Sequence, residues 1–121
     1  MKITDEFVAN IRSSIREHLR LLADPVAQRE YERNVPVADV PAELLCGWCD
    51  DVYHPASAAF QSAFSPRELA ALAEFDNLFN AAAAELPDPL LRLRELQAHP
   101  AWGRVMSGAA TALQGVFGPA V

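Results

Sequence analysis

Prolines at the starts of helical segments constrain the fold of this chain more than any other feature. Five of them are followed by runs in which apolar residues recur at three- and four-residue spacing: Pro25, Pro41, Pro66, Pro89 and Pro100. Proline fits the first turn of a helix, where its missing N–H is not needed, but it breaks a helix interior. Ser65 and Glu68 add a capping box around one of these starts. The pattern predicts a series of helices joined by short connections.

The apolar stripes of these segments predict the fold class. They are Phe7, Val8, Ile11, Ile15, Leu19 and Leu22; Leu44, Leu45, Trp48 and Val52; Leu69, Leu72, Phe75, Phe79, Ala82 and Ala83; and Trp102, Val105, Met106, Ala109 and Leu113. No useful length of the chain alternates apolar and polar residues, so we expect no sheet. A chain of 121 residues suits one domain. We therefore predict an all-α fold, a compact single-domain bundle of about six helices over residues 1–121.

Three local boundaries follow from the same pattern. The segment that starts at Pro41 is expected to run as one helix through Val52, until His54-Pro55 breaks it. A short helix or turn is expected over residues 58–64. Asp88-Pro89 resembles an N-cap followed by a first-turn proline, so we predict that a short helix begins there.

Charge is distributed unevenly along the chain. Residues 1–33 hold six basic and six acidic side chains, and the formal net charge of the whole chain is −6. Residues 39–88 set a single basic residue, Arg67, against Asp39, Glu43, Asp50, Asp51, Glu68, Glu74, Asp76, Glu85 and Asp88. A field of this sign repels nucleic acid and anionic lipid and attracts basic proteins. We expect no nucleic-acid partner, although Arg12, Arg16 and Arg20 lie at four-residue spacing.

The expected compartment is the cytoplasm. No apolar run approaches the roughly 20 residues needed to cross a bilayer, so no membrane partner is expected. The first residues lack the apolar stretch and small-residue cleavage site of a secretory signal. Two cysteines do not make a disulfide framework, which favours a reducing environment.

The Cys46-Gly47-Trp48-Cys49 motif has the spacing of a dithiol redox couple or of half a zinc site. The start at Pro41 places both cysteines inside a helix, where the helix dipole gives little help. For zinc, His54 could supply a third ligand, but nothing marks a fourth. We favour the simpler interpretation that these are two small, half-buried residues one turn apart.

The sequence offers little for catalysis. It contains no G-x-S-x-G, no H-E-x-x-H and no glycine-rich phosphate loop. Asp50 and Asp51 are adjacent, so on a helix they point about 100° apart and do not share a substrate atom easily. We therefore expect a binding protein rather than an enzyme, with no cofactor and no metal.

An acidic face is the strongest candidate site. On the helix from Pro41, Glu43 and Asp50 fall opposite the apolar stripe, with Asp51 beside them, and Tyr53 follows as an aromatic of the kind that anchors interfaces. Asp76 lies at the edge of the stripe on the helix from Pro66. Carboxylates that flank apolar or aromatic groups suit a basic protein partner. The alternative is a solvated face whose carboxylates pair with nearby arginines.

The chain resembles small bacterial proteins encoded beside polymorphic toxins at residues 31–44 and 48–55, at 60–64 leading into Ser65 and the helix through Phe75, and at 100–102 and 105–106. The similarity covers most of the chain as scattered positions, and it is to immunity proteins of contact-dependent growth inhibition systems. The resemblance implies a cytoplasmic protein that binds and neutralises the C-terminal toxin domain of a sibling's delivery protein. Many such toxins are nucleases with basic grooves, which an acidic surface could occupy. Glu43, Asp50, Asp51 and Asp76 would then supply charge and Tyr53 packing, although the family has no shared binding motif.

Two other functions fit the same residues. One is a cytoplasmic helical adaptor or regulator that binds another basic protein. The other is a thiol redox protein that uses Cys46 and Cys49. The sequence leaves open the identity of a toxin, the part of the toxin that is covered and the oligomeric state.

Overall fold

The computed structural model describes residues 4–118, and this part of the chain is all-α, as the sequence predicted. Its elements are α1 (Asp5–Ala23), α2 (Pro25–Asn34), α3 (Val40–Gly47), the π-helical turn η1 (Trp48–Val52), α4 (Ala58–Ser62), α5 (Pro66–Ala83), α6 (Leu93–Ala98) and α7 (Pro100–Phe117). The described residues thus form seven α-helices rather than about six, because the one-turn segment α4 is a helix with its own cap. Ser57 accepts the N–H of Phe60 there.

Proline and capping side chains begin four of the helices at the expected positions. Proline occupies the first turn of α2, α3, α5 and α7. Ser65 and Glu68 form both halves of the capping box of α5. The capping box satisfies backbone N–H groups that have no partner within the helix, and a first-turn proline has no N–H that needs one. The sequence pattern therefore locates most helix starts correctly.

Asp88-Pro89 does not begin a helix, which corrects one predicted boundary. The peptide bond between these residues is cis, and α6 starts only at Leu93, after an N-cap residue without a side-chain cap. Leu93 and Leu96 are buried, whereas Leu90 and Leu91 are only partly buried. The helix thus forms where its apolar pair meets the core, and the residues before it form a connection.

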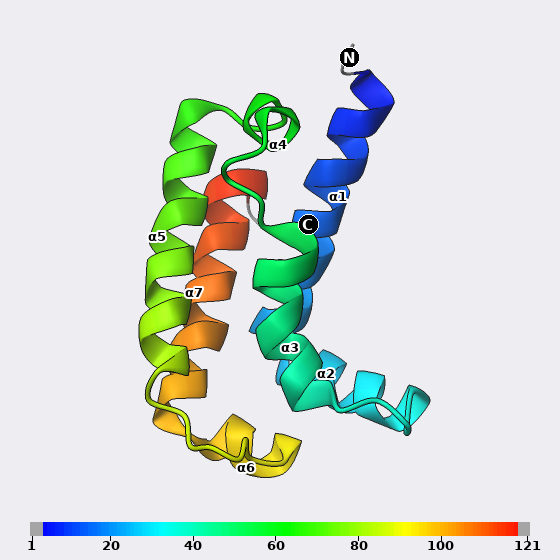
Figure 1. Cartoon of the computed structure of the whole chain (residues 1–121), viewed down its shortest axis with the longest axis vertical. Helices are drawn as coiled ribbons and strands as arrows, with labels where there is room; N and C mark the ends of the chain where they lie inside the picture. Colours follow the sequence, from blue (N-terminus) through cyan, green and yellow to red (C-terminus); the bar gives the residue numbers. More distant parts are fainter. Residues whose placement is uncertain (1–3, 119–121) are drawn as a thin grey trace.

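Three long helices make the body of the fold, with α5 and α7 antiparallel and side by side (Figure 1). α1 packs on α7, and α3 with η1 packs on α1, so that η1 lies between α1 and α5. The largest fully buried side chains include Trp48, Trp102, Leu19 and Leu72. No helix among residues 4–118 has both the length and the apolar character needed to span a bilayer.

A buried glutamine ties one end of this body together. The side chain of Gln28 is fully buried, and its Nε2 donates to the carbonyl oxygens of Leu21 and Leu22 at 2.9 and 3.1 Å. Its Oε1 accepts from Gln97 Nε2 and Trp102 Nε1 at 3.0 and 3.2 Å. The carbonyl groups belong to the last turn of α1, where i+4 partners are lost and only Leu21 accepts a further backbone N–H, from Asp24 at 3.4 Å. One side chain in α2 therefore connects α1, α6 and α7.

Arg12 ties the opposite end of α1 to α5. Its guanidinium donates to both carboxylate oxygens of Glu68, at 2.9 and 3.1 Å, and to the carbonyl of Ala63 at 3.0 Å. It also lies over the rings of Phe64 and Phe117, at 5.1 and 5.4 Å from their centroids. The predicted arginine stripe is thus divided, because Arg12 serves tertiary structure and is not free to bind phosphate.

The helix that starts near Pro41 does not remain α-helical through Val52. From Trp48 the backbone widens into η1, and the N–H of Tyr53 donates to the carbonyl of Trp48, five residues earlier, at 2.9 Å. A π-turn contains one more residue than the α-turn it replaces and changes the direction of the side chains around it. It is the region that carries Asp50 and Asp51.

Candidate functional site

The site is built around the fully buried Trp48. Its ring stacks on Tyr53, with centroids 4.9 Å apart and planes 9° apart, and meets the edge of Phe75 at the same centroid distance. Its Nε1 donates to Asp76 Oδ1 at 3.0 Å. Asn80, one turn further along α5, donates to the other oxygen of Asp76 at 3.2 Å. The half-buried Asp76 is therefore held in one orientation between η1 and α5.

Tyr53 belongs to the core and is not an exposed aromatic. Only 9% of its surface is exposed, and its ring is enclosed by Trp48 on one face and by the edge contact with Phe60. Burial, followed by the charge of Asp76, raises the pKa of its hydroxyl. The expectation of an exposed anchor fails because the π-turn directs residue 53 inward against the tryptophan ring. Tyr53 therefore supports the site by stacking on the ring of Trp48.

Asp50 and Asp76 lie on the same side of η1, next to Cys49. Burial raises the pKa of the Cys49 thiol, and the charges of Asp76 and Asp50 raise it further. Asp50 is exposed and Asp76 half-buried. Two residues far apart in sequence thus direct negative charge toward the same part of the surface.

Glu43 and Asp51 lie on the other side of η1, at a pocket of about 410 Å³ that also contains His18 and Cys46. Burial lowers the pKa of His18 below its ordinary value of 6.5, and the nearby Asp51 opposes part of this effect. Its Nε2 is buried without a hydrogen-bond partner among the described residues. His18 therefore presents a neutral imidazole beside two carboxylates.

Glu43 is held by a residue that the sequence did not single out. Tyr31, from α2, donates its hydroxyl to a carboxylate oxygen of Glu43, and this bond raises the pKa of the tyrosine. The contact fixes Glu43 at the mouth of the pocket while leaving it exposed. A carboxylate at each end of the candidate site is thus held by a hydrogen bond from an aromatic side chain. Trp48 donates to Asp76, and Tyr31 donates to Glu43.

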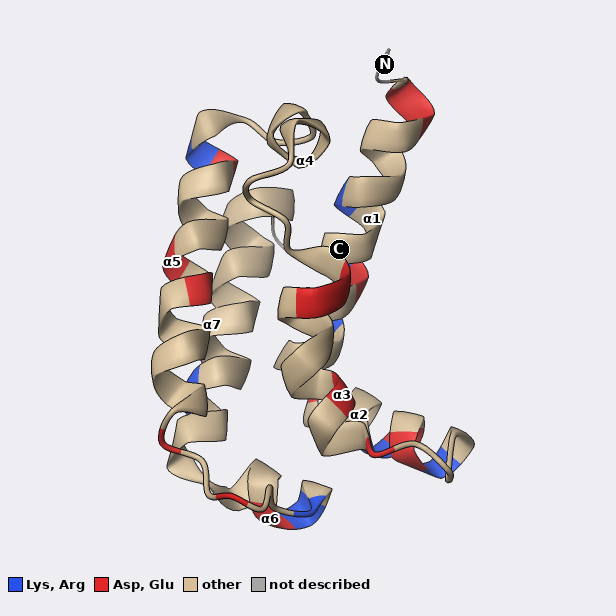
Figure 2. Ribbon diagram, viewed as in Figure 1, with Lys and Arg blue, Asp and Glu red and all other residues tan. Residues whose placement is uncertain are grey.

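Together these four residues, Glu43, Asp50, Asp51 and Asp76, form what we call the η1 acidic surface. Figure 2 shows acidic residues on the turn that follows α3 and on α5, with little blue between them. Helical wheels placed Glu43, Asp50 and Asp51 on the helix from Pro41 and Asp76 on the helix from Pro66. The structure brings them together around η1, but it divides them between the side of Asp76 and the side of His18.

None of the four carboxylates forms an ion pair within residues 4–118. The ion pairs there are Arg12–Glu68 and Arg104–Glu85. Glu68 and Glu85 belong to the acidic segment, but their partners, Arg12 and Arg104, lie outside it, so a count of charges within residues 39–88 overstated the local excess. The excess that remains is concentrated at η1, where arginine pairing does not occur among the described residues.

The two cysteines lie at the surface, in η1 and just before it. Cys46 and Cys49 are free and exposed, and the pKa of Cys49 is raised, whereas a reactive thiol has a lowered one. In the part of the chain that the structure describes, no three His, Cys, Asp or Glu side chains are placed to hold a metal ion. Cys49 instead borders the acidic surface.

His18 is the residue of this region that sequence reasoning missed. It comes from α1, and its ring lies against the backbone of Gly47, where an added Cβ would stand 2.7 Å from His18 Cε1. A glycine inside a helix can signal such a close approach. The identity of the neighbouring side chain, however, depends on the packing of α1 against α3, which no local pattern in the sequence reveals.

Comparison of the chain with protein-family models, with curated proteins and with solved structures gave no match. The arrangement of residues around η1 is therefore the basis for the functional argument.

Proposed function

We propose that this chain is an immunity protein, which binds the basic toxin domain of a contact-dependent growth inhibition system through the η1 acidic surface. The observation that carries the proposal is the absence of ion pairs at Glu43, Asp50, Asp51 and Asp76 among the described residues. Glu68, by contrast, is held by Arg12. The carboxylates around η1 are available to an external cation.

The acidic surface suits a basic protein for two physical reasons. Clustered charge of one sign accelerates association with an oppositely charged partner, and it disfavours acidic competitors. In addition, Trp48 and Tyr31 hold Asp76 and Glu43 in place by hydrogen bonds. Side chains that are already oriented lose less conformational freedom on binding. This combination favours a protein ligand with fixed positive groups, such as the substrate groove of a nuclease.

In this proposal each residue has a separate part. Asp50 and Asp51 are fully available at the surface and steer the partner, whereas Asp76 and Glu43 fix its register. Tyr53 packs beneath Trp48 and keeps η1 in place without touching the partner. The toxin would be inhibited by occupation of its basic groove in the cytoplasm of the producing cell, with no chemical step on this chain.

The test compares two double variants that change the net charge equally. Asp50→Lys with Asp51→Lys reverses charge at η1, and Glu30→Lys with Glu32→Lys does so at exposed positions of α2. Tagged wild-type protein is first used to capture partners from the native cell at low and high salt. Association rates with the captured protein are then measured across salt concentrations.

We expect the η1 variant to slow association at least about tenfold at low salt and the α2 variant to change it much less. We also expect the captured protein to be a basic domain that stops growth when expressed alone and is tolerated with this chain. A non-toxic basic partner with the same salt dependence would support the adaptor function instead. Equal effects of the two variants would reject the η1 surface.

A further inference from the structure

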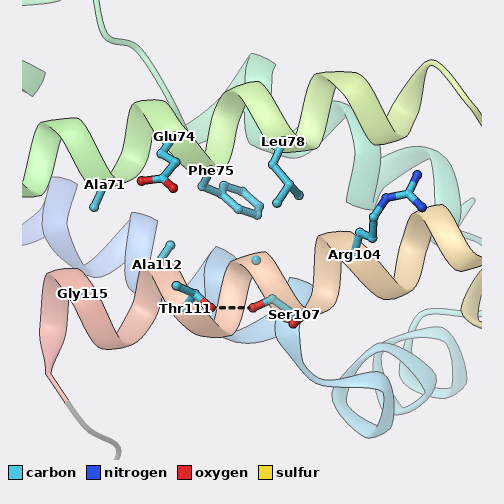
Figure 3. A pocket seen from close by; sticks show the side chains of 10 residues that line it. Ala71, Glu74, Phe75, Leu78, Arg104, Ser107, Thr111, Ala112 and Gly115 are labelled. Atoms are coloured by element: carbon cyan, nitrogen blue, oxygen red, sulfur yellow. Dashed lines mark hydrogen bonds between the residues drawn. The ribbon is translucent and has the colours of Figure 1, made fainter.

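A groove between α5 and α7 forms a second surface, distinct from the η1 acidic surface. Its volume is about 380 Å³, and it is lined from α5 by Glu74, Phe75 and Leu78 (Figure 3). Glu74 and Asp76 are two residues apart, so they project from nearly opposite sides of α5. A ligand in this groove therefore does not contact the carboxylates around η1.

The side of the groove formed by α7 is small and uncharged. After Arg104 the sequence contains no charged residue to its end. Leu78 packs closely over Gly108, since an added Cβ would stand only 3.1 Å from the leucine methyl carbons. Leu78 itself is 36% exposed. Depletion of charge around an exposed apolar side chain is typical of the centre of a protein interface.

The two ends of the groove carry opposite charges. Glu74 projects beside Thr111 and Ala112, and Arg104 lies at the other end, with Leu78 between them (Figure 3). Glu74 has no ion-pair partner among residues 4–118, whereas Arg104 pairs with Glu85. A guanidinium has five N–H donors and can accept a second carboxylate. Two copies of this surface that face each other in opposite directions therefore place the acidic end of each against the basic end of the other.

We propose that a second copy of this chain occupies the groove, related to the first by a two-fold axis near Gly108. Gly108 lies four residues from Arg104 and three from Thr111 along α7. Rotation about this point places Glu74 of each copy opposite Arg104 of the other, and it brings the Leu78 side chains, which cover Gly108 in each copy, close to one another. Such an interface is isologous, and both charge contacts occur twice.

The charge of the chain favours this face for self-association. Two copies that each carry a net charge of −6 repel one another where carboxylates face carboxylates, as they would at η1. Around the α5–α7 groove, Arg104 offsets one of the two carboxylates, Glu74 and Glu85, so the repulsion between two copies is weaker there. A strongly basic partner would find little to attract it there. The dimer is thus independent of the proposed function and leaves the η1 acidic surface free.

Sedimentation equilibrium of the full chain over a range of concentrations tests the proposal without any added partner. Glu74→Arg and Arg104→Glu each create two repulsive contacts in a homodimer. We expect each variant alone to raise the dimer dissociation constant about tenfold or more. An equimolar mixture of the two restores both attractive contacts, and we expect it to dimerise nearly as well as the wild type.

A steric pair of variants gives a second readout. Thr111→Arg places a long side chain in the groove, while Ala110→Arg adds the same group to the next exposed residue of α7, which does not line the groove. We expect only the first to abolish the dimer, with circular dichroism unchanged in both. A wild-type chain that stays monomeric at millimolar concentration would overturn the proposal. So would a dimer that both charge variants and Thr111→Arg leave intact.

Discussion

Polar side chains have opposite roles around Gln28 and at the η1 acidic surface. At Gln28, the amide donates to two carbonyl groups and accepts from two side chains, so that all of its hydrogen-bonding capacity is used inside the protein. At η1, four carboxylates lie at or near the surface, and none meets a lysine or arginine among the described residues. The first region resembles a structural joint, and the second resembles a surface prepared for a ligand.

The difference distinguishes polar side chains that hold the fold together from polar side chains that remain free to bind a partner. A buried polar group must be paired, because leaving it without a hydrogen bond costs more than the bond itself contributes. An exposed carboxylate has no such requirement, since water solvates it. Stability should therefore respond strongly to changes at Gln28 and weakly to changes at Asp50 or Asp51.

Replacing Gln28 should give the largest effect. Gln28→Ala removes both donors to the last turn of α1 and the acceptor for Gln97 and Trp102, and it leaves a cavity in a buried site. We expect the free energy of unfolding to fall by about 3 kcal/mol. Urea denaturation followed by circular dichroism measures the loss. The matched control, Gln114→Ala at an exposed position of α7, should change stability by less than about 0.5 kcal/mol.

Arg12→Ala should give the next largest effect. It removes the paired contact with Glu68, the bond to the carbonyl of Ala63 and the packing on two phenylalanine rings. Because the guanidinium is partly screened by water, with 32% of its side chain exposed, we expect a loss of about 1–2 kcal/mol. Arg20→Ala, at an exposed position on the same helix, serves as the control. Equal losses in the two would show that Arg12 is not a tertiary tie.

Asp76 combines the two roles, because it belongs to the η1 acidic surface and also accepts a hydrogen bond from the buried Trp48. We expect Asp76→Ala to lower the free energy of unfolding by about 1 kcal/mol, as the indole N–H loses its acceptor. Asp50→Ala should change it by less than about 0.5 kcal/mol. A stability loss at Asp50 as large as at Asp76 would mean that η1 itself depends on its surface charge.

His18 should give the smallest effect, and only in acid. Its folded-state pKa is lowered by burial, so above pH 6.5 the imidazole is neutral in both states and contributes nothing. As pH falls below 6.5, the unfolded chain takes up the proton first, and the free energy of unfolding decreases until the folded state is protonated as well. His18→Gln should remove this part of the pH dependence, measured by urea midpoints. The exposed His54→Gln should keep it.

The sequence predicted the fold class and most helix starts because these depend on local chemistry. Proline and capping residues at Asp24, Asp39 and Ser65 act within one turn, and apolar spacing acts within one helix. The start of α6 was misplaced because its position depends on where Leu93 reaches the core, which is a tertiary property. The expected α-helix through Val52 likewise gives way to a π-turn where Trp48 packs against Tyr53.

The candidate site could be predicted only in part, for the same reason. The surplus of carboxylates between residues 39 and 88 is a property of composition, and it led to Glu43, Asp50, Asp51 and Asp76. The partners of these residues come from other helices: Tyr31 from α2, His18 from α1 and Trp48 from η1. No spacing rule connects such positions, and the inward turn of Tyr53 depends on the same packing.

The two tryptophans give the molecule a pair of built-in optical reporters. Both indoles are fully buried and both donate a hydrogen bond, but Trp48 donates to Asp76 and Trp102 to Gln28. Indole emission responds to the group that its N–H contacts, so each ring senses a different part of the protein. With Trp102 replaced by phenylalanine, fluorescence reports on the surroundings of η1 alone; with Trp48 replaced, it reports on the joint at Gln28. The two single-tryptophan variants thus record changes in these two parts of the molecule separately, without an added label.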